Sequence, residues 1–149
     1  MKLPKIAILS FAVLAAPIFG AEPARPSEVA EAARTAEIAK ALAQATVVQR
    51  KVEEFRLREN RFPASTQEAG VVPPKKTDQG PLTGLAVVAD GRIELTLGSS
   101  SGVDGGRIML TPTLATSTDP RNVQWACESP SYPSIADASN GLCEYVKSP

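Results

Sequence analysis

A long stretch without glycine or proline, from Ser27 to Asn60, carries apolar residues at a helical period. Ala, Glu, Lys, Arg, Leu and Gln, the strongest helix formers, dominate its composition. Ser27 can serve as N-cap, and Arg56 and Arg58 near the end suit the helix dipole. The pattern predicts one long helix over residues 27–60, about 50 Å long at about 1.5 Å per residue.

The two halves of this predicted helix differ in what they can bury. From Ile38 onward, apolar residues recur at steps of three and four, as expected for a face that covers a sheet. They are Ile38, Leu42, Ala45, Val48, Val52 and Phe55. Before Ile38 the apolar residues are mostly alanines, with Val29. The first half therefore either protrudes or frays for lack of buried area, or packs normally, and both alternatives stay open.

Beyond the helix, a connecting loop over residues 61–83 leads to segments with the alternation of strands. Leu85–Ala89 and Arg92–Leu97 flank Asp90-Gly91, a strong hairpin signal. Arg107–Thr111 is predicted as a third strand and Asn122–Cys127 as a fourth. The order of elements predicts an α+β fold, with the long helix packed on a four-stranded antiparallel sheet over residues 84–127.

Two details of these strands carry further expectations. Pro112 should bend the third strand or place it at an edge, because proline cannot donate to a strand ladder. The two-residue period puts Val123, Trp125 and Cys127 on one face of the fourth strand. We expect the indole and the first sulfur to lie together on the covered side.

The N-terminus has the order of parts of a secretory signal peptide. A basic start, Met1–Lys5, precedes the apolar run Ile6–Phe19 and the small residues Gly20 and Ala21. A retained membrane anchor is the alternative, but a spanning helix needs about 20 apolar residues, and this run is shorter. We predict a signal peptide over residues 1–20, a mature domain over 21–149 and no stable membrane span in the mature form.

Charge and composition exclude several classes of function. Loss of Lys2 and Lys5 would leave 14 basic residues against 16 acidic ones, a net charge of about −2, which does not favour nucleic-acid binding. The chain has no histidine, the commonest general base and transition-metal ligand. We therefore expect no metal and no cofactor.

The two cysteines, Cys127 and Cys143, enclose a segment with two prolines and an Asn-Gly pair, which indicates an irregular loop over residues 128–143. In an exported protein such a pair predicts a structural disulfide, worth about 3 kcal/mol for a loop of about this size. A redox role lacks a Cys-x-x-Cys pair, and a metal site would have two sulfurs and no histidine.

Catalysis has little support in the sequence. A serine hydrolase could pair a serine with Lys75, Lys76 or Lys147, but the Ser-x-x-Lys motif does not occur. The glycine-rich stretch Gly102–Gly106 joins two predicted strands, so it lacks the strand-to-helix context of a phosphate loop. We predict that the protein is not an enzyme.

Four phrases, in this order along the chain, resemble the head domain of type IV pilins of the type IVa group. They are Arg61–Ser65 with Glu68–Gly70, Gly91–Gly98, Ile108–Leu114, and Val123–Cys127 closed by Cys143. The resemblance covers roughly Glu28 to Cys143. It implies a long helix on an antiparallel sheet, a disulfide-bounded D-region near the C-terminus and a link to type IV pili.

The N-terminus departs from this family. Pilins keep an apolar, glutamate-containing segment after a leader that ends in glycine, whereas here the apolar run precedes the predicted cut. A Sec-type signal thus replaces the pilin leader and the hydrophobic helix. The resemblance therefore implies a pilin-like head released in soluble form rather than a major filament subunit.

We predict a non-enzymatic exported protein that acts through protein contacts in type IV pilus biology or cell adhesion, with pilus or other envelope proteins as partners. Its predicted location is the periplasm or surface of a Gram-negative bacterium, or secreted. Tyr132 and Ile135 are candidate contact residues in the loop, unless they fill its interior. Val29, Ala32 and Ala36 form a second candidate surface, unless they are only strong helix formers. The alternative function is a soluble periplasmic binding module for a small ligand or glycan.

Overall fold

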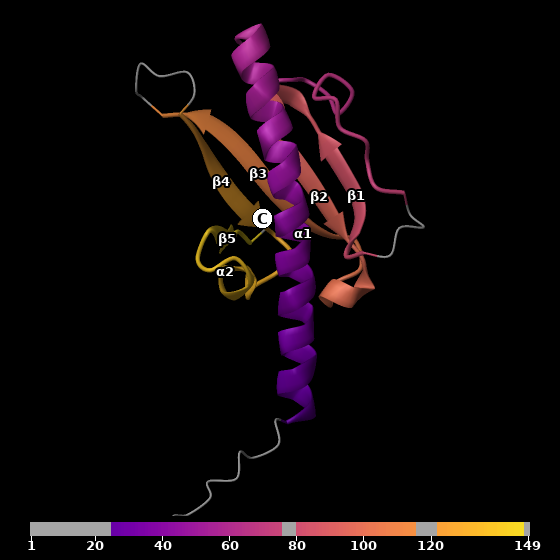
Figure 1. The fold of residues 1–149 in the computed structure, drawn as a ribbon. Helices are drawn as coiled ribbons and strands as arrows, with labels where there is room; N and C mark the ends of the chain where they lie inside the picture. The colour runs from indigo at the N-terminus through magenta and orange to yellow at the C-terminus, as the bar shows by residue number, and fades with distance from the viewer. Residues whose placement is uncertain (1–24, 76–79, 116–121, 148–149) are drawn as a thin grey trace, which may run out of the picture.

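A single long helix crosses one face of a five-stranded sheet in the computed structural model of the protein, which describes residues 25–75, 80–115 and 122–147 (Figure 1). The elements are α1 (Pro26–Glu59), β1 (Leu82–Val87), β2 (Ile93–Leu97), β3 (Gly106–Leu114), β4 (Val123–Ser129), α2 (Ile135–Ala138) and β5 (Cys143–Tyr145). Short 3-10 turns, Ala89–Gly91 and Ser99–Ser101, follow β1 and β2. The predicted signal peptide lies outside the described residues.

Helix α1 has 34 residues and confirms the predicted long helix. Its N-cap is Arg25 rather than Ser27, and the Arg25 amide donates to the Glu28 carboxylate at 3.0 Å. Pro26 takes the first helical position, where its missing N–H leaves no hydrogen bond unmade. The helix ends at Asn60, whose left-handed conformation (φ 54°) is one that asparagine tolerates.

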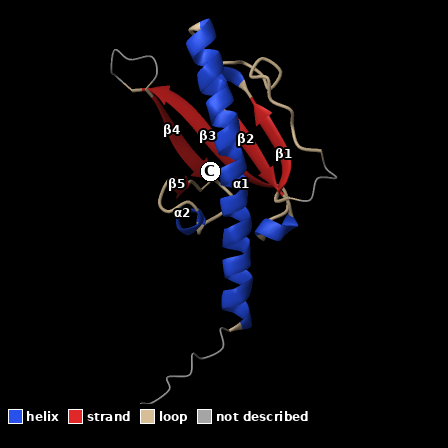
Figure 2. Ribbon diagram, viewed as in Figure 1, coloured by secondary structure: helices blue, strands red, loops and turns tan. Residues whose placement is uncertain are grey.

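The strands follow one another in the sheet in chain order, β1 to β5 (Figure 2). The first four are antiparallel, as predicted, whereas β5 pairs parallel with β4, so the predicted four-stranded sheet has a fifth strand. This strand is only three residues long, and the disulfide pair Cys127 and Cys143 lies at its first rung. Its formation depends on this tertiary link and is invisible to a local pattern.

The first hairpin turns at Asp90-Gly91, as predicted. Both residues have positive φ (61° and 71°), which is the conformation that the Asp-Gly pair favours in tight turns. Gly91 also approaches α1 closely, because a Cβ there would lie 3.0 Å from Val52 Cγ1. β1 begins at Leu82, three residues before the strand predicted from the alternation.

The core lies between α1 and the sheet. The predicted alternation holds on β2, where Ile93, Leu95 and Leu97 are buried, and on β3 with Ile108 and Leu110. The helix covers them with a buried stripe: Ile38, Ala41, Ala45, Val48, Val52 and Phe55. Leu42, predicted for this stripe, is only half-buried at its edge, and Ala41 takes its place.

Pro112 lies within β3, opposite Trp125 of β4. Pairing of β2 with β3 ends at Ile93 and Leu110, so Pro112 lies where β3 has a partner on one side only. This agrees with the expectation of an edge position.

None of the helices in the described residues combines the length and the apolar character needed to cross a membrane.

Candidate functional site

The predicted disulfide joins Cys127 of β4 to Cys143 of β5, with Cα atoms 4.4 Å apart. Both cysteines are buried, and both belong to the main core cluster. The Cys143 amide donates to Ser139 Oγ at 2.9 Å, which fixes the segment before β5 as well. The enclosed segment, residues 128–143, is called the disulfide-bounded loop below.

Tyr132 and Ile135, predicted as candidate contact residues of this loop, are 4% and 0% exposed. Of the two alternatives left open for these residues, the structure shows the second, that they fill the interior of the loop. The reason is that the loop folds back over the open end of the core beside α1. Tyr132 Oη lies 2.6 Å from Ser101 Oγ, and a Cβ at Gly106 would collide with the tyrosine ring.

The Tyr132 hydroxyl also donates to the carbonyl oxygen of Val103 at 3.3 Å. Burial raises the pKa of Tyr132 above its ordinary value of 10.0, although the hydrogen bond with Ser101 acts in the opposite direction. The phenol is therefore neutral over the physiological pH range and works as a structural anchor. The partner Ser101 carried no signal in the sequence beyond its place in a serine run after β2.

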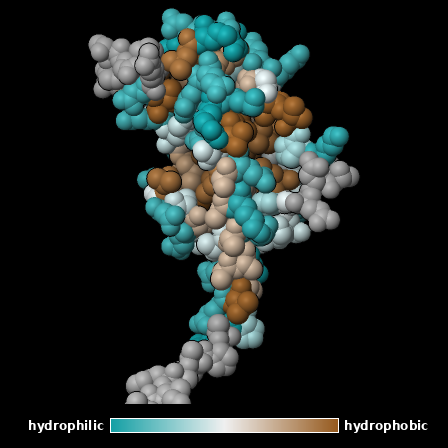
Figure 3. All heavy atoms as spheres, viewed as in Figure 1, coloured by the Kyte–Doolittle hydropathy of each residue, from teal (hydrophilic) through white to brown (hydrophobic). Residues whose placement is uncertain are grey.

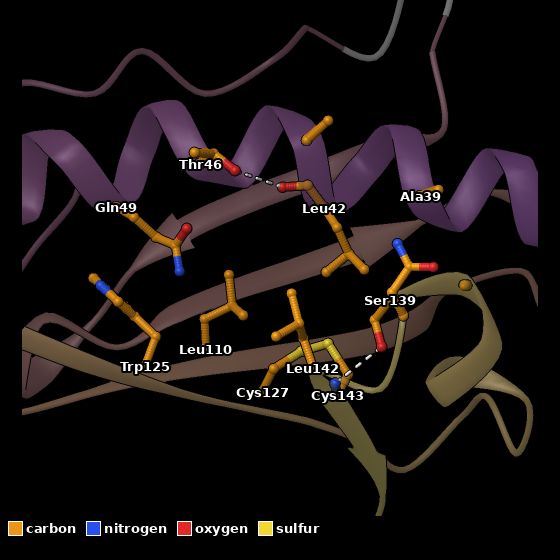
Figure 4. A pocket seen from close by; sticks show the side chains of 13 residues that line it. Ala39, Leu42, Thr46, Gln49, Leu110, Trp125, Cys127, Ser139, Leu142 and Cys143 are labelled. Carbon is orange, nitrogen blue, oxygen red and sulfur yellow. Dashed lines mark hydrogen bonds between the residues drawn. A yellow bond between two sulfur atoms is a disulfide. The ribbon is translucent and has the colours of Figure 1, made fainter.

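A groove separates the disulfide-bounded loop from α1 (Figure 4). Its volume is about 370 Å³, and we call it the loop groove. Helix α1 contributes Leu42, Thr46 and Gln49 to one wall, and Leu110 lies in the floor. On the loop side, Leu142 lines the groove and is 79% exposed.

Trp125 closes one end of the loop groove. Its indole Nε1–H donates to the Glu53 carboxylate of α1 at 2.8 Å, and its ring packs against the core cluster. Trp125 and Cys127 thus lie on the helix side of β4, as predicted. Sequence reasoning missed the groove itself, because Leu42 read as an ordinary residue of the buried helix stripe and only the tertiary fold brings it beside Leu142.

The second candidate surface, which we call the α1 stripe, consists of Val29, Ala32 and Ala36. All three are exposed, and Val29 is 56% exposed. Their spacing of three and four residues places them on one face of the helix. The helix is regular here but extends past the sheet, with apolar side chains on its surface (Figure 3). Of the two alternatives left open for this half, the structure shows protrusion.

Beside the α1 stripe, Ala32 and Ala36 line a shallow hollow together with Asp137 and Ala138 of α2. The stripe therefore lies next to the disulfide-bounded loop, although the loop does not cover it. Whether the stripe binds a partner stays a prediction at this point.

Hydrogen bonds and an ion pair hold the turn that follows α1 against the domain, in contrast to the exposed start of the helix. Arg61 forms a two-pronged ion pair with Glu68 at 3.0 and 3.1 Å, and the Ala64 amide donates to the same carboxylate at 2.8 Å. The hydrogen bond from Arg61 contributes most to lowering the pKa of Glu68 below its ordinary value of 4.5, and the bond from the Ala64 amide adds to it. The hydrogen bond to Glu68 in turn raises the pKa of Arg61. Pro63 accepts a hydrogen bond from the Gly91 amide at 2.9 Å, which links this turn to the first hairpin.

Of the three lysines considered for hydrolase chemistry, Lys75 and Lys147 are exposed and Lys76 lies outside the described residues. Within the described part of the chain, no three His, Cys, Asp or Glu side chains are placed to hold a metal ion. The site thus consists of two surfaces, the loop groove and the α1 stripe, on either side of α2.

The decisive comparison is with known protein families. The family model described as pilin, a bacterial filament protein, matches residues 33–141. The chain belongs to the pilin family. The match runs from within α1 into the disulfide-bounded loop, so it covers β1 to β4 and most of the residues that line the loop groove, but not Leu142 or β5. A search of curated proteins finds no match to this pilin.

Proposed function

We propose that this pilin is a non-enzymatic protein of the cell envelope that acts through protein contacts in type IV pilus biology or cell adhesion. The family supports a structural role and a location at the cell surface, because pilins form bacterial filaments. Family membership also favours this function over a soluble binding module for a small ligand or glycan. The specific partner and the Gram-negative periplasm or surface belong to the proposal.

The single observation that carries the proposal is the uncovered first half of α1. Apolar residues scattered singly on a surface need no explanation, but here three lie in line on a helix that leaves the domain. Residues 25–34 are all exposed, so the head buries little of their surface. A regular helix that stabilises no core is well placed to present a face to another protein.

Photo-crosslinking in cells that produce the protein tests this function. A photoreactive phenylalanine at Ala32 should give covalent adducts with pilus or other envelope proteins, identified by mass spectrometry. Ala30 provides the matched control, because it is exposed in the same turns but lies on the opposite side of the helix. Equal crosslinking from both positions, or none from Ala32, would count against the proposed function.

Export is the second part of the proposal. If residues 1–20 are a signal peptide, mass spectrometry of the native protein should find an N-terminus close to Ala21 in the envelope or secreted fraction. A protein that retains Met1–Phe19 and is extracted only from membranes would show instead that the segment is an anchor.

A further inference from the structure

We propose that Asn140 is a self-modification site that the folded disulfide-bounded loop keeps unreacted, and that opening of the loop allows its conversion to aspartate and isoaspartate. The Asn140-Gly141 pair lies between α2 and β5, at the end of that loop. Both residues are exposed. The reaction consumes only water and needs no partner, so this inference is independent of the proposed function.

The reaction is an attack of the backbone on the neighbouring side chain. The Gly141 nitrogen loses its proton to solvent base and bonds to the Asn140 Cγ atom, and ammonia leaves with a proton taken from solvent. Water then opens the resulting five-membered imide at either carbonyl, which gives an aspartyl or an isoaspartyl linkage. Glycine has no side chain to hinder the attack, and apart from the chain neighbours no described atom lies within 4 Å of the place of a Cβ at Gly141.

The fold occupies the attacking nitrogen with a hydrogen bond. The Gly141 amide donates to the carbonyl oxygen of Ala136 in α2 at 2.7 Å. The next amide, that of Leu142, donates to the carbonyl oxygen of Ser139 at 3.2 Å. These bonds cap the end of α2, with Asn140 in the left-handed conformation (φ 53°) usual for such a cap. A hydrogen-bonded amide loses its proton only when the bond opens, so the imide forms only after this turn has opened.

The two ends of α2 are held by buried groups. Ile135, its first residue, is 0% exposed. Cys143, two residues after Gly141, is buried and bound to Cys127, and its amide donates to Ser139 Oγ at 2.9 Å. The reactive turn thus lies between two anchors in the core. Loss of either anchor raises the population of the open loop and, with it, the rate of the reaction.

The modification would change the loop groove. Asn140 lines the groove, and none of the described residues that line it is charged. Either product therefore places one negative charge at the rim of an uncharged surface. The isoaspartyl product also lengthens the backbone by one methylene group, so the cap of α2 cannot form again with the same bonds. A transient opening of the loop would become a lasting change of this surface.

The other two asparagines serve as internal controls. Asn60 has the same left-handed conformation (φ 54°), but its side chain accepts a hydrogen bond from Arg56 at 2.8 Å, and Arg61 follows it. Asn122 precedes the branched Val123. Because a side chain on the following residue hinders the attack, both should stay unreacted while Asn140 reacts.

Peptide mapping by mass spectrometry, on full-length mature protein incubated at one neutral pH and one temperature, tests the inference. Conversion of Asn140 should be at least about tenfold faster in protein unfolded by urea than in the folded, disulfide-bonded protein. The double variant with Cys127 and Cys143 replaced by alanine should react at an intermediate rate without urea. Equal rates in folded and unfolded protein, or a double variant as slow as the natural protein, would overturn the role of loop opening. Absence of reaction at Asn140 in urea would overturn the site itself.

A control variant and a second measurement check the mechanism. Asn140→Gln in urea should show no mass change over the same time, because glutamine must close a six-membered ring, a much slower reaction. Hydrogen exchange followed by NMR should show the Gly141 amide protected by the same factor by which the fold slows the conversion, because both require opening of its bond to Ala136. A Gly141 amide that exchanges as in an unfolded chain would contradict the inference.

Discussion

The α1 stripe and the disulfide-bounded loop both carry apolar residues, but the stripe is exposed to solvent and the apolar side chains of the loop are buried. Val29 in the regular helix is 56% exposed, whereas Ile135 in the irregular loop is 0% exposed. The loop lies over the end of the core and gains its order from burial. The helix half is regular by propensity and by continuity with its packed half, with no core of its own.

Regular secondary structure and burial by tertiary contacts are therefore separate properties. A segment rich in alanine can form a helix without contributing to the free energy of unfolding of the domain. An irregular segment with four serines and two prolines can hold the core together when it carries one or two large apolar side chains. Contact function is therefore better sought on the helix than in the buried part of the loop.

The largest expected effect on stability comes from truncating Ile135, the buried side chain of the disulfide-bounded loop. Ile135→Ala should lower the free energy of unfolding by about 2–5 kcal/mol, because it leaves a cavity in the core. Val29→Ala should change it by less than about 0.5 kcal/mol, as for an exposed position without partners. Urea denaturation measures both. Similar losses for the two variants would mean that the first half of α1 is covered.

Removal of the disulfide should have the next effect. Replacing both Cys127 and Cys143 by alanine should lower the free energy of unfolding by about 3 kcal/mol, the entropic value for a closed loop of about 15 residues. We expect the double variant to remain folded at neutral pH, because Tyr132 and Ile135 still hold the loop. Loss of the cooperative urea transition would show instead that the disulfide alone orders it.

Tyr132→Phe removes one hydroxyl and should cost about 1 kcal/mol, the net value of a typical hydrogen bond. Its pH dependence gives a second readout. Because the pKa of Tyr132 is raised in the folded state, its stabilisation is complete below about pH 10 and is lost as the pH rises through the folded pKa. The natural protein should lose stability at alkaline pH more steeply than the phenylalanine variant. Equal slopes would show that the phenol is not buried.

The smallest effect concerns the fastened end of α1. The pKa of Glu68 is lowered in the folded state, so its contribution is present above its ordinary pKa and is lost as the pH falls through the folded value. Glu68→Gln should flatten the fall of the melting temperature between about pH 5 and pH 2. Gln67→Glu, an exposed neighbour, provides a control for the change of charge. If the melting temperature of Glu68→Gln fell with pH as steeply as that of the natural protein, the ion pair with Arg61 would not contribute to stability.

Local patterns were enough to predict the parts of the fold that obey local rules. The glycine-free stretch predicted α1 to within one residue at each end, and the alternation at Ile93, Leu95 and Leu97 predicted the buried face of β2. The Asp90-Gly91 turn was predicted because a positive φ favours few residue types. The order of these elements sufficed for the fold class.

The rest depends on contacts between distant segments. The strand Cys143–Tyr145 is too short to show a pattern, and it exists through pairing with β4 and the disulfide. The burial of Tyr132 depends on the hydroxyl of Ser101 and on the missing side chain of Gly106, positions far away in the sequence. The exposure of Leu142 beside α1 likewise depends on how distant segments pack, so the loop groove could not be predicted from the sequence.

Hydrogen exchange along α1 in dilute, full-length mature protein tests the central claim most directly, namely that the first half of the helix is folded but uncovered. Backbone amides of residues 29–36 should exchange orders of magnitude faster than those of Ala41–Phe55, whose exchange should require global unfolding. The boundary should fall near Ile38, where burial begins. Equally slow exchange in both halves would contradict the account, because it would require tertiary cover over the whole helix.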